Sequence, residues 1–123
     1  MSKIISFNKK IKNFKKKIIV PGDKSLSIRW VLFASLGNGI SRARNLLMSE
    51  DVIAALNTIK KFGIKVKIKK NDIKVYGKGF GGYKYSKRLV IDAENSGTLG
   101  RLILGILVDT PYPIKLIGDK SLS

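Results

Sequence analysis

The segment Pro21-Gly22-Asp23-Lys24-Ser25-Leu26-Ser27-Ile28-Arg29 sets the order of the first structural elements. An apolar run precedes it at 18–20, and a second apolar run follows it at 30–34. Pro21 and Gly22 interrupt extended backbone, and Asp23 or Ser25 can cap a helix that begins there. The order therefore predicts a strand, a tight turn and a helix that extends to about Leu36, with Gly37-Asn38-Gly39 as its C-cap.

Polar side chains gather in the first turn of this expected helix. A helix start exposes unpaired backbone N–H groups at the positive end of the helix dipole. Lys24 and Ser25 fall in that turn, and Arg29 lies one turn after Ser25 on the same side. Together these donors favour a phosphate or carboxylate ligand. An ordinary capped helix with solvated cations is the alternative interpretation. A nucleotide P-loop does not fit, because its first glycine would fall at Lys17.

Length and composition indicate one folded domain or part of one. The chain has 123 residues, and 44% of them are hydrophobic, which is enough for a packed core. No apolar run approaches the roughly 18 residues of a membrane span, and the N-terminus lacks the features of a secretory signal. We therefore expect a cytoplasmic protein with no membrane partner. Cysteine and histidine are absent, so we expect no disulfide and no metal.

Positive charge dominates the composition, with 25 basic residues against 8 acidic ones. Such a charge attracts polyanions, and a small basic module that binds nucleic acid is one hypothesis. Two observations weigh against it. Most of the cations are lysines, whereas recognition of base edges favours arginine. Lysine, isoleucine and asparagine also share A/T-rich codons, so a biased genome would produce the same composition. Nucleic acid is therefore the less favoured partner.

Alternating strands and helices are expected in the first half of the chain. Apolar runs at 4–7 and 18–20 predict two strands that a basic stretch connects. Ile40 to Leu47 predicts another strand. Ser49 is expected to cap a second helix, whose apolar stripe consists of Val52, Ala55, Leu56 and Ile59.

A hairpin and a glycine-rich loop follow this second helix. Apolar residues alternate with lysines from 64 to 69, and Ile73 and Val75 continue the pattern after a turn at Asn71-Asp72. This alternation predicts a hairpin with one buried face and one lysine face. The loop at 77–82 lacks the strand-then-helix context of a dinucleotide motif, so we expect a mobile connector.

A second polar helix start follows a predicted strand at 89–91. Asn95-Ser96-Gly97-Thr98 offers an amide, two hydroxyls and a backbone N–H that glycine leaves open to close approach, with Arg101 one turn on. The helix behind it has apolar residues at 99, 102, 103 and 106, and the prolines in 110–113 stop it. A last strand is predicted at 114–117. The order of elements predicts α/β units in which helices cover a mixed sheet.

These motifs resemble those of the 5-enolpyruvylshikimate-3-phosphate synthase family. The resemblance rests on Lys24-Ser25 with Arg29, on 95–98 with Arg101, and on Gly-Asp-Lys-Ser-Leu at 118–122. The segment Asn45-Leu46-Leu47-Met48-Ser49-Glu50-Asp51 is also similar. The resemblance implies an α/β fold of βαβαββ repeat units, the inside-out α/β barrel of the enolpyruvyl transferases. Residues 1–123 would hold the first unit and the start of the next, so the fold would be incomplete in this chain.

The resemblance also implies an activity. The family transfers the carboxyvinyl group of phosphoenolpyruvate to the 5-hydroxyl of shikimate 3-phosphate and releases phosphate, in the shikimate pathway to chorismate and the aromatic amino acids. It needs no metal or cofactor. Its partners would be these two small anionic substrates, and the full-length enzyme would be a monomer.

Roles for individual residues follow from the same resemblance. Residues that hold shikimate 3-phosphate would be Lys24, Ser25 and Arg29. Residues that meet phosphoenolpyruvate would be Lys24, Asn95, Gly97 and Thr98. Lys24 would thus touch both substrates as the catalytic residue, and Arg101 would brace the loop.

Some features depart from the family pattern. Ile28 and Trp30 stand where smaller or polar residues are frequent, and Glu94 stands where glycine is usual. The arginine expected to grip phosphoenolpyruvate and the residues that transfer protons would follow Ser123. We therefore expect an amino-terminal fragment that catalyses nothing alone. The related UDP-N-acetylglucosamine enolpyruvyl transferases share the fold but pair Lys with Asn in the first motif, so Ser25 favours the shikimate enzyme.

Overall fold

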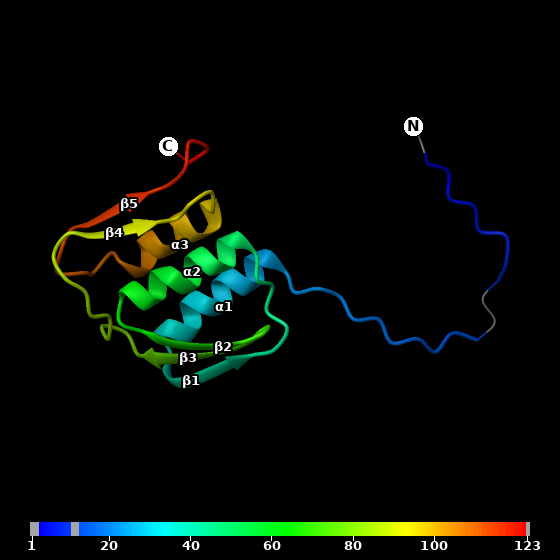
Figure 1. The fold of residues 1–123 in the computed structure, drawn as a ribbon, viewed down its shortest axis with the longest axis horizontal. Coiled ribbons are helices and arrows are strands. Elements are labelled where there is room, and N and C mark those ends of the chain that lie inside the picture. The colour runs from blue at the N-terminus through cyan, green and yellow to red at the C-terminus, as the bar shows by residue number, and fades with distance from the viewer. Residues whose placement is uncertain (1–2, 11–12, 123) are drawn as a thin grey trace.

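Helices lie between two separate sheets in the computed structural model of the chain, which describes residues 3–10 and 13–122 (Figure 1). In chain order the elements are α1 (Lys24–Leu36), β1 (Asn38–Ala43), α2 (Glu50–Lys61), β2 (Lys65–Lys69), β3 (Asp72–Lys78), β4 (Leu89–Asp92), α3 (Gly97–Ile106) and β5 (Ile114–Ile117). The first sheet is antiparallel with the order β1-β3-β2, and the second pairs β4 with β5 in parallel.

The two sheets replace the single mixed sheet that the sequence predicted. Helix α1 contacts β3 in the first sheet, and α2 contacts β2 on one side and β4 on the other. The strands β4 and β5 are parallel because α3 forms the crossover between them. Helix α2 therefore needs apolar residues toward both sheets, which explains why it is buried on most of its circumference.

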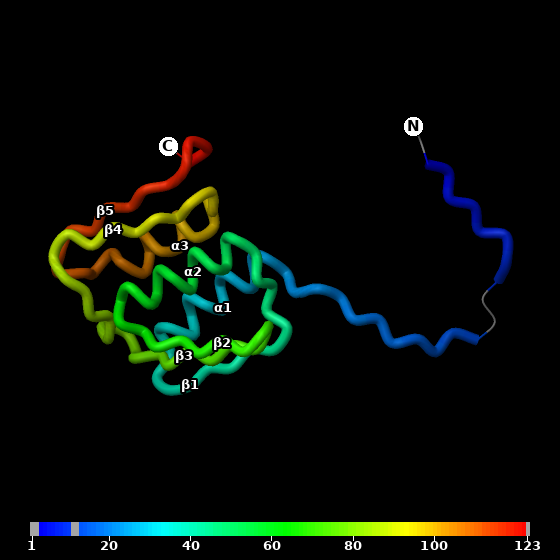
Figure 2. Tube along the Cα trace, viewed as in Figure 1, coloured from blue at the N-terminus to red at the C-terminus, as the bar shows by residue number. Residues whose placement is uncertain are grey.

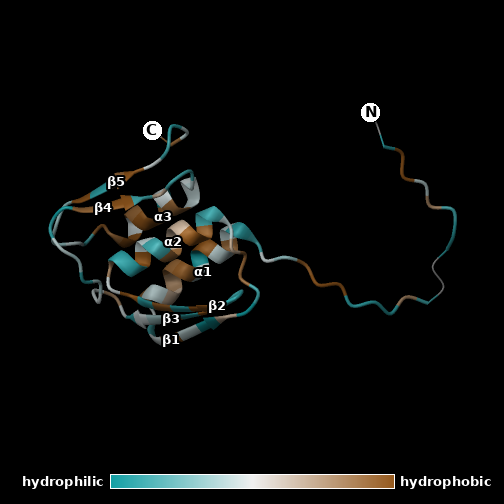
Figure 3. Cartoon of the chain, viewed as in Figure 1, coloured by the Kyte–Doolittle hydropathy of each residue, from teal (hydrophilic) through white to brown (hydrophobic). Residues whose placement is uncertain are grey.

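The core forms where α1 and α2 meet the inner face of the first sheet. The predicted stripe of α2 is confirmed, since Val52, Ala55, Leu56 and Ile59 are each at most 1% exposed. From β3, Ile73 and Val75 are equally buried. Full burial of each large aliphatic side chain contributes roughly 1.5–3 kcal/mol. Figure 3 shows the same concentration of apolar residues on the helices between the sheets.

The strand after α1 is shorter than predicted. It begins at Asn38, directly after Gly37 ends the helix by donating its N–H to the Phe33 carbonyl at 3.0 Å. It ends at Ala43, not Leu47, because the backbone turns at Asn45, where φ is 57°. The turn buries Leu46, which is 7% exposed.

Gly77 belongs to β3 and not to the predicted glycine-rich loop. A Cβ atom at this position would lie 2.2 Å from the Gly37 carbonyl oxygen and 2.4 Å from the Ala34 carbonyl oxygen. The end of α1 therefore packs directly against the β3 backbone at Gly77, which has no side chain in between. The predicted turn of the hairpin also moves by one residue, to Lys70-Asn71, since Lys69 pairs with Asp72.

Aromatic rings fasten the segment after β3 to the helices. Phe62 at the end of α2 stacks on Tyr83 with ring centroids 4.6 Å apart, and it meets Tyr85 edge-on at 5.5 Å. The Tyr83 hydroxyl lies 2.5 Å from the Ser35 hydroxyl of α1. The segment directly after the glycine-rich loop is thus packed against the helices through Tyr83 and Tyr85. The expected mobility of the loop at 77–82 stays a prediction.

The predicted strands at 4–7 and 18–20 are wrong. The described parts of the segment before α1 contain no helix or strand, and the chain runs away from the folded body (Figure 2). A strand needs a partner for its backbone hydrogen bonds, and no described strand pairs with this segment. Its large apolar side chains are 66–92% exposed: Ile4, Ile5, Phe7, Phe14, Ile18, Ile19 and Val20. Within the described ranges, no helix has the length and apolar character to cross a bilayer.

Candidate active site

The three helices run in the same general direction and begin at the same end of the molecule (Figure 1). They pack against one another, since α1 contacts α2 and α3, and α2 contacts α3. We call the residues at this end, 22–29, 49–51 and 94–101, the helix-start surface. The positive ends of three helix dipoles lie on it, together with unpaired backbone N–H groups. Such a surface favours anionic ligands.

Asp23 caps α1. Its Oδ1 accepts a hydrogen bond from the Leu26 N–H at 2.7 Å. Of the two capping residues that the sequence allowed, the structure thus selects Asp23. The Ser25 hydroxyl, which is half-buried in the first turn, is left without a described hydrogen bond and remains available to a ligand.

A neighbouring segment clamps this helix start. A Cβ atom on Gly22 would lie 2.8 Å from the Asn45 carbonyl oxygen and 2.9 Å from the Leu47 nitrogen, so the turn requires glycine for close approach. The Asn45 side-chain amide donates to the Val20 carbonyl at 3.3 Å. The Leu47 N–H donates to the Ser27 hydroxyl at the same distance. Residues 45–47, which carry part of the family resemblance, therefore hold the first motif in place.

Lys24 pairs with Asp51, the second residue of α2. The Lys24 Nζ and the Asp51 Oδ2 are 3.5 Å apart, and the two side chains are 53% and 14% exposed. Sequence reasoning named Asp51 only within the segment 45–51 that resembles the family, and it missed this contact. The pair joins the starts of two helices and holds the ammonium over the helix-start surface.

The predicted N-cap residue of α2, Ser49, is confirmed, but its side chain makes no capping hydrogen bond. The Ser49 Oγ is buried and has no hydrogen-bond partner in the described part of the chain. Glu50 and Asp51 instead place negative charge in the first turn, where the carboxylates interact favourably with the positive end of the helix dipole.

The second motif forms a capped helix start as the sequence predicted. Ser96 is 1% exposed, and its hydroxyl accepts a hydrogen bond from the Leu99 N–H at 3.3 Å. Asn95 is exposed, while Gly97 and Thr98 are half-buried. A Cβ atom on Gly97 would lie 3.6 Å from the Arg101 Nη1, so the guanidinium group lies beside the glycine.

Glu94 holds a strained position just before this motif. Its φ of 52° lies in the left-handed region that favours glycine. The Asp92 Oδ1 accepts the Glu94 N–H at 2.8 Å, and the Glu94 carbonyl accepts the Asp119 N–H at 2.8 Å. Two fixed neighbours thus stabilise the conformation of a residue that stands where the family usually has glycine.

The turn after β5 repeats the first motif. Gly-Asp-Lys-Ser-Leu-Ser occurs at 22–27 and again at 118–123, a repeat that the sequence reasoning did not use. In the second copy the Asp119 Oδ1 accepts hydrogen bonds from the Ser121 N–H at 2.8 Å and from the Ser121 hydroxyl at 2.5 Å. The Ser121 hydroxyl holds the pKa of the Asp119 carboxyl below its usual value. Ser123 lies outside the described residues.

The first and second motifs both lie on the helix-start surface. No hydrogen bond or ion pair between described residues joins 24–29 to 95–101, and Arg29 is exposed. A pocket of about 480 Å³ lies beside the second motif and is lined by Gly97, Arg101, Gly118 and Leu122 among others. Within residues 3–10 and 13–122, no three carboxylate, cysteine or histidine side chains gather into a possible metal site.

Comparison with known proteins decides the family. A sequence model of EPSP synthase (3-phosphoshikimate 1-carboxyvinyltransferase) matches residues 8–123. This chain belongs to the EPSP synthase family. The 3-phosphoshikimate 1-carboxyvinyltransferase of Bacillus cytotoxicus is 41% identical over 105 residues, which cover 85% of this chain and 24% of that protein. The enzyme of the same name from Thermoanaerobacter sp. strain X514 is 40% identical over 114 residues, covering 92% and 26%.

Solved structures show the same relationship. The structure of EPSP synthase from Acinetobacter baumannii superposes with a TM-score of 0.80 at 33% identity, over 89% of this chain and 25% of that one. The chain therefore spans about a quarter of the length of its EPSP synthase relatives. The predicted family and α/β fold class are confirmed. The division into repeat units and the roles of single residues remain predictions.

Proposed function

We propose that this chain provides a substrate-binding part of a 3-phosphoshikimate 1-carboxyvinyltransferase, the name that its relatives carry. The reaction transfers the carboxyvinyl group of phosphoenolpyruvate to the 5-hydroxyl of shikimate 3-phosphate and releases phosphate. Both substrates are polyanions. The observation that supports the proposal most directly is the Lys24–Asp51 pair at 3.5 Å on the helix-start surface, where helix dipoles favour anions.

The first motif would hold shikimate 3-phosphate. Asp23 accepts the Leu26 N–H in the cap, which leaves the Ser25 hydroxyl and the N–H groups of Lys24 and Ser25 for the phosphate. Arg29 is exposed one turn further along and can form a bidentate contact. Lys24 would lie between both substrates, and its ion pair with Asp51 would orient the ammonium toward them.

The second motif would meet phosphoenolpyruvate. Asn95 and Thr98 provide an exposed amide and a half-buried hydroxyl, and Gly97 lets an anion approach the start of α3. Arg101 would act indirectly, since its guanidinium lies beside Gly97 and can brace the turn. Fixed donors of this kind stabilise charge that develops in a transition state.

Proton transfer would depend on other groups. The chain has no histidine. Of the carboxylates at this end, Asp23 caps α1, Asp51 pairs with Lys24, and Asp92 accepts the Glu94 N–H. The Glu50 and Glu94 side chains are exposed. A carboxyvinyl transfer requires groups that move protons at the reacting carbon. We therefore propose that the chain alone is inactive and that the complete enzyme is a cytoplasmic monomer. None of the comparisons reported above supports a UDP-N-acetylglucosamine enolpyruvyl transferase.

A chimera tests the proposal. Residues 8–123, the range that the family model matches, replace the corresponding part of the Bacillus cytotoxicus relative. We expect phosphate release that depends on both substrates, and we expect Lys24→Met to abolish most of it. Lys60→Met is the matched control, because Lys60 is an exposed lysine in the last turn of α2. Near-normal turnover of the Lys24→Met chimera would refute the assignment of Lys24, and turnover by the isolated chain would refute its predicted inactivity.

A further inference from the structure

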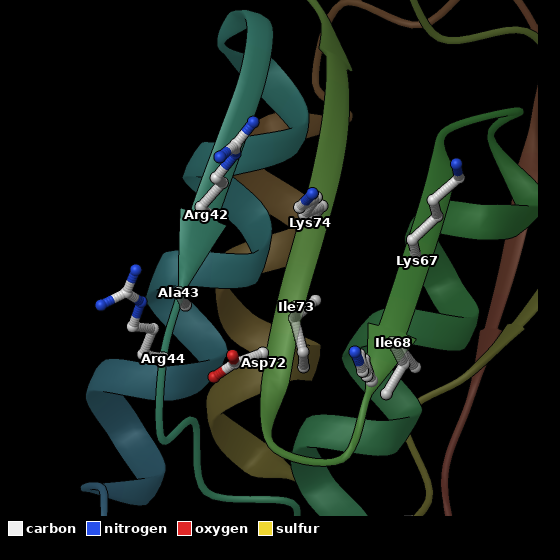
Figure 4. A pocket seen from close by; sticks show the side chains of 9 residues that line it. Arg42, Ala43, Arg44, Lys67, Ile68, Asp72, Ile73 and Lys74 are labelled. Atoms are coloured by element: carbon white, nitrogen blue, oxygen red, sulfur yellow. The ribbon is translucent and has the colours of Figure 1, made fainter.

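The outer face of the β1-β3-β2 sheet carries a row of three cations. The register places Arg42 of β1 opposite Lys74 of β3, and Lys67 of β2 opposite the same Lys74. Figure 4 shows the three side chains on neighbouring strands. This face lies away from α1 and α2, which cover the inner face of the sheet (Figure 1).

The charges in this row are not neutralised within the described residues. Directly opposite side chains on neighbouring strands lie about 4.5–5.5 Å apart at Cβ, where like charges repel. No ion pair with a described acidic residue involves Arg42, Lys67 or Lys74. A pocket of about 690 Å³ lies over this part of the sheet, and Asp72 is the acidic residue among its lining residues. An anion bound here would relieve the repulsion.

The cations also repeat along the edge strand. Lys65, Lys67 and Lys69 alternate with inward-facing residues on β2, so they recur on the outer face about every 6.7 Å. A single phosphate would meet only part of this array. A linear chain of phosphates would meet cations along β2 and across to Lys74 and Arg42.

An aromatic ring lies within the same face. Tyr76 of the central strand β3 is opposite Lys65, whose Nζ lies 5.3 Å from the ring centroid. The ring is half-buried, and the Lys65 ammonium lies over one of its faces. Aromatic rings flanked by cations are the usual platforms for single-stranded nucleic acid, because every base can stack on them.

We propose that this face, formed by Arg42, Lys65, Lys67, Lys69, Lys74 and Tyr76 and called here the basic sheet face, binds single-stranded nucleic acid through its phosphate backbone. The site is separate from the helix-start surface and has no part in the proposed transfer reaction. It binds without base recognition, since lysine and a single ring do not distinguish base edges.

The test is a salt-dependent binding measurement on the full chain. Fluorescence anisotropy of a labelled oligothymidylate of about 20 nucleotides gives the affinity. The triple variant R42Q/K67Q/K74Q removes three charges from the basic sheet face, and K15Q/K16Q/K17Q removes the same number from the segment before α1. Circular dichroism confirms that both variants remain folded, which we expect because these side chains are exposed.

The expected result is a loss that depends on salt. Each phosphate contact to a single strand contributes about 0.7 to the log–log salt slope, so three lost contacts lower its magnitude by about 2. The affinity loss of R42Q/K67Q/K74Q would then be about 18-fold greater at roughly 50 mM than at roughly 200 mM salt. Equal losses in the two triple variants would overturn the proposal, because binding would then follow net charge alone.

Two further measurements decide the class of polyanion. We expect Tyr76→Leu to weaken the binding of oligothymidylate at least about fivefold, which is the smallest affinity loss typical for one stacked base. The same variant should leave the binding of inorganic polyphosphate unchanged. Poly-glutamate of equal charge should compete weakly. Equal effects of Tyr76→Leu on both phosphate chains, or competition by poly-glutamate as strong as by unlabelled oligothymidylate, would overturn the assignment to nucleic acid.

Discussion

The Asp51→Asn substitution distinguishes the contribution of the Lys24–Asp51 ion pair to stability from its contribution to turnover. At 3.5 Å and an effective dielectric constant of about 20, the direct attraction would be about 5 kcal/mol. The Lys24 side chain is 53% exposed, however, so water screens most of it. Exposed pairs contribute about 0.2–1 kcal/mol to folding. We therefore expect Asp51→Asn to lower the free energy of unfolding by no more than about 1 kcal/mol.

The effect on turnover should be much larger. Asp51 fixes where the Lys24 ammonium lies, and a displacement of about 1 Å at a reacting centre can reduce a rate about 100-fold. In the chimera described above, we expect a loss of turnover of that order with little change in substrate affinity.

Urea unfolding of the chain and phosphate release by the chimera give the two quantities. Glu50→Gln is the control, because Glu50 is an exposed carboxylate in the same turn of α2 and has no described ion pair. We expect the control to match the parent in both assays. The reasoning fails if Asp51→Asn keeps normal turnover, or if it loses stability and turnover to the same degree as a general defect in folding would.

Three other substitutions test the site and the core. Arg29→Lys should weaken the binding of shikimate 3-phosphate with little change in turnover, because a bidentate group becomes a point charge. Isothermal titration calorimetry measures this affinity. Gly97→Ala should weaken phosphoenolpyruvate more than shikimate 3-phosphate, and equal losses would indicate a disturbed fold. Tyr83→Phe should cost about 0.5–1.5 kcal/mol in urea unfolding, since the hydrogen bond to Ser35 is lost. Burial raises the pKa of Tyr83 above 10.0, so the parent should lose stability as pH rises from about 10 through the folded value, and Tyr83→Phe should lack this loss.

Local patterns predicted the helices well. All three helices begin within about two residues of the predicted starts, because caps and apolar periodicity are properties of short segments. The buried stripe of α2 and the alternating hairpin were also predicted correctly. These local patterns could not predict which strands pair with one another. The apolar run at 18–20 has strand composition, but no described strand lies beside it.

The position of Gly77 in the fold could not be predicted from local sequence either. The sequence placed Gly77 in a loop because glycine is common there. In the structure it lies in a strand, and the reason is the close approach of the end of α1, about 40 residues earlier in the chain. A contact of this kind has no local signature, so neither the longer β3 nor the packing of Tyr83 behind it was predictable.

The repeated motif shows which features of the site the local sequence determines and which depend on distant residues. The shared Gly-Asp-Lys-Ser-Leu forms an aspartate-capped turn both at Asp23 and at Asp119, although only the first copy is followed by a described helix. Each copy carries a lysine directly after its aspartate. Lys24 has Asp51 as its partner, whereas Lys120 forms no ion pair with any residue that the structure describes. The local sequence therefore builds a turn suited to anions, and the start of a second helix distinguishes the lysine that we assign to the reaction.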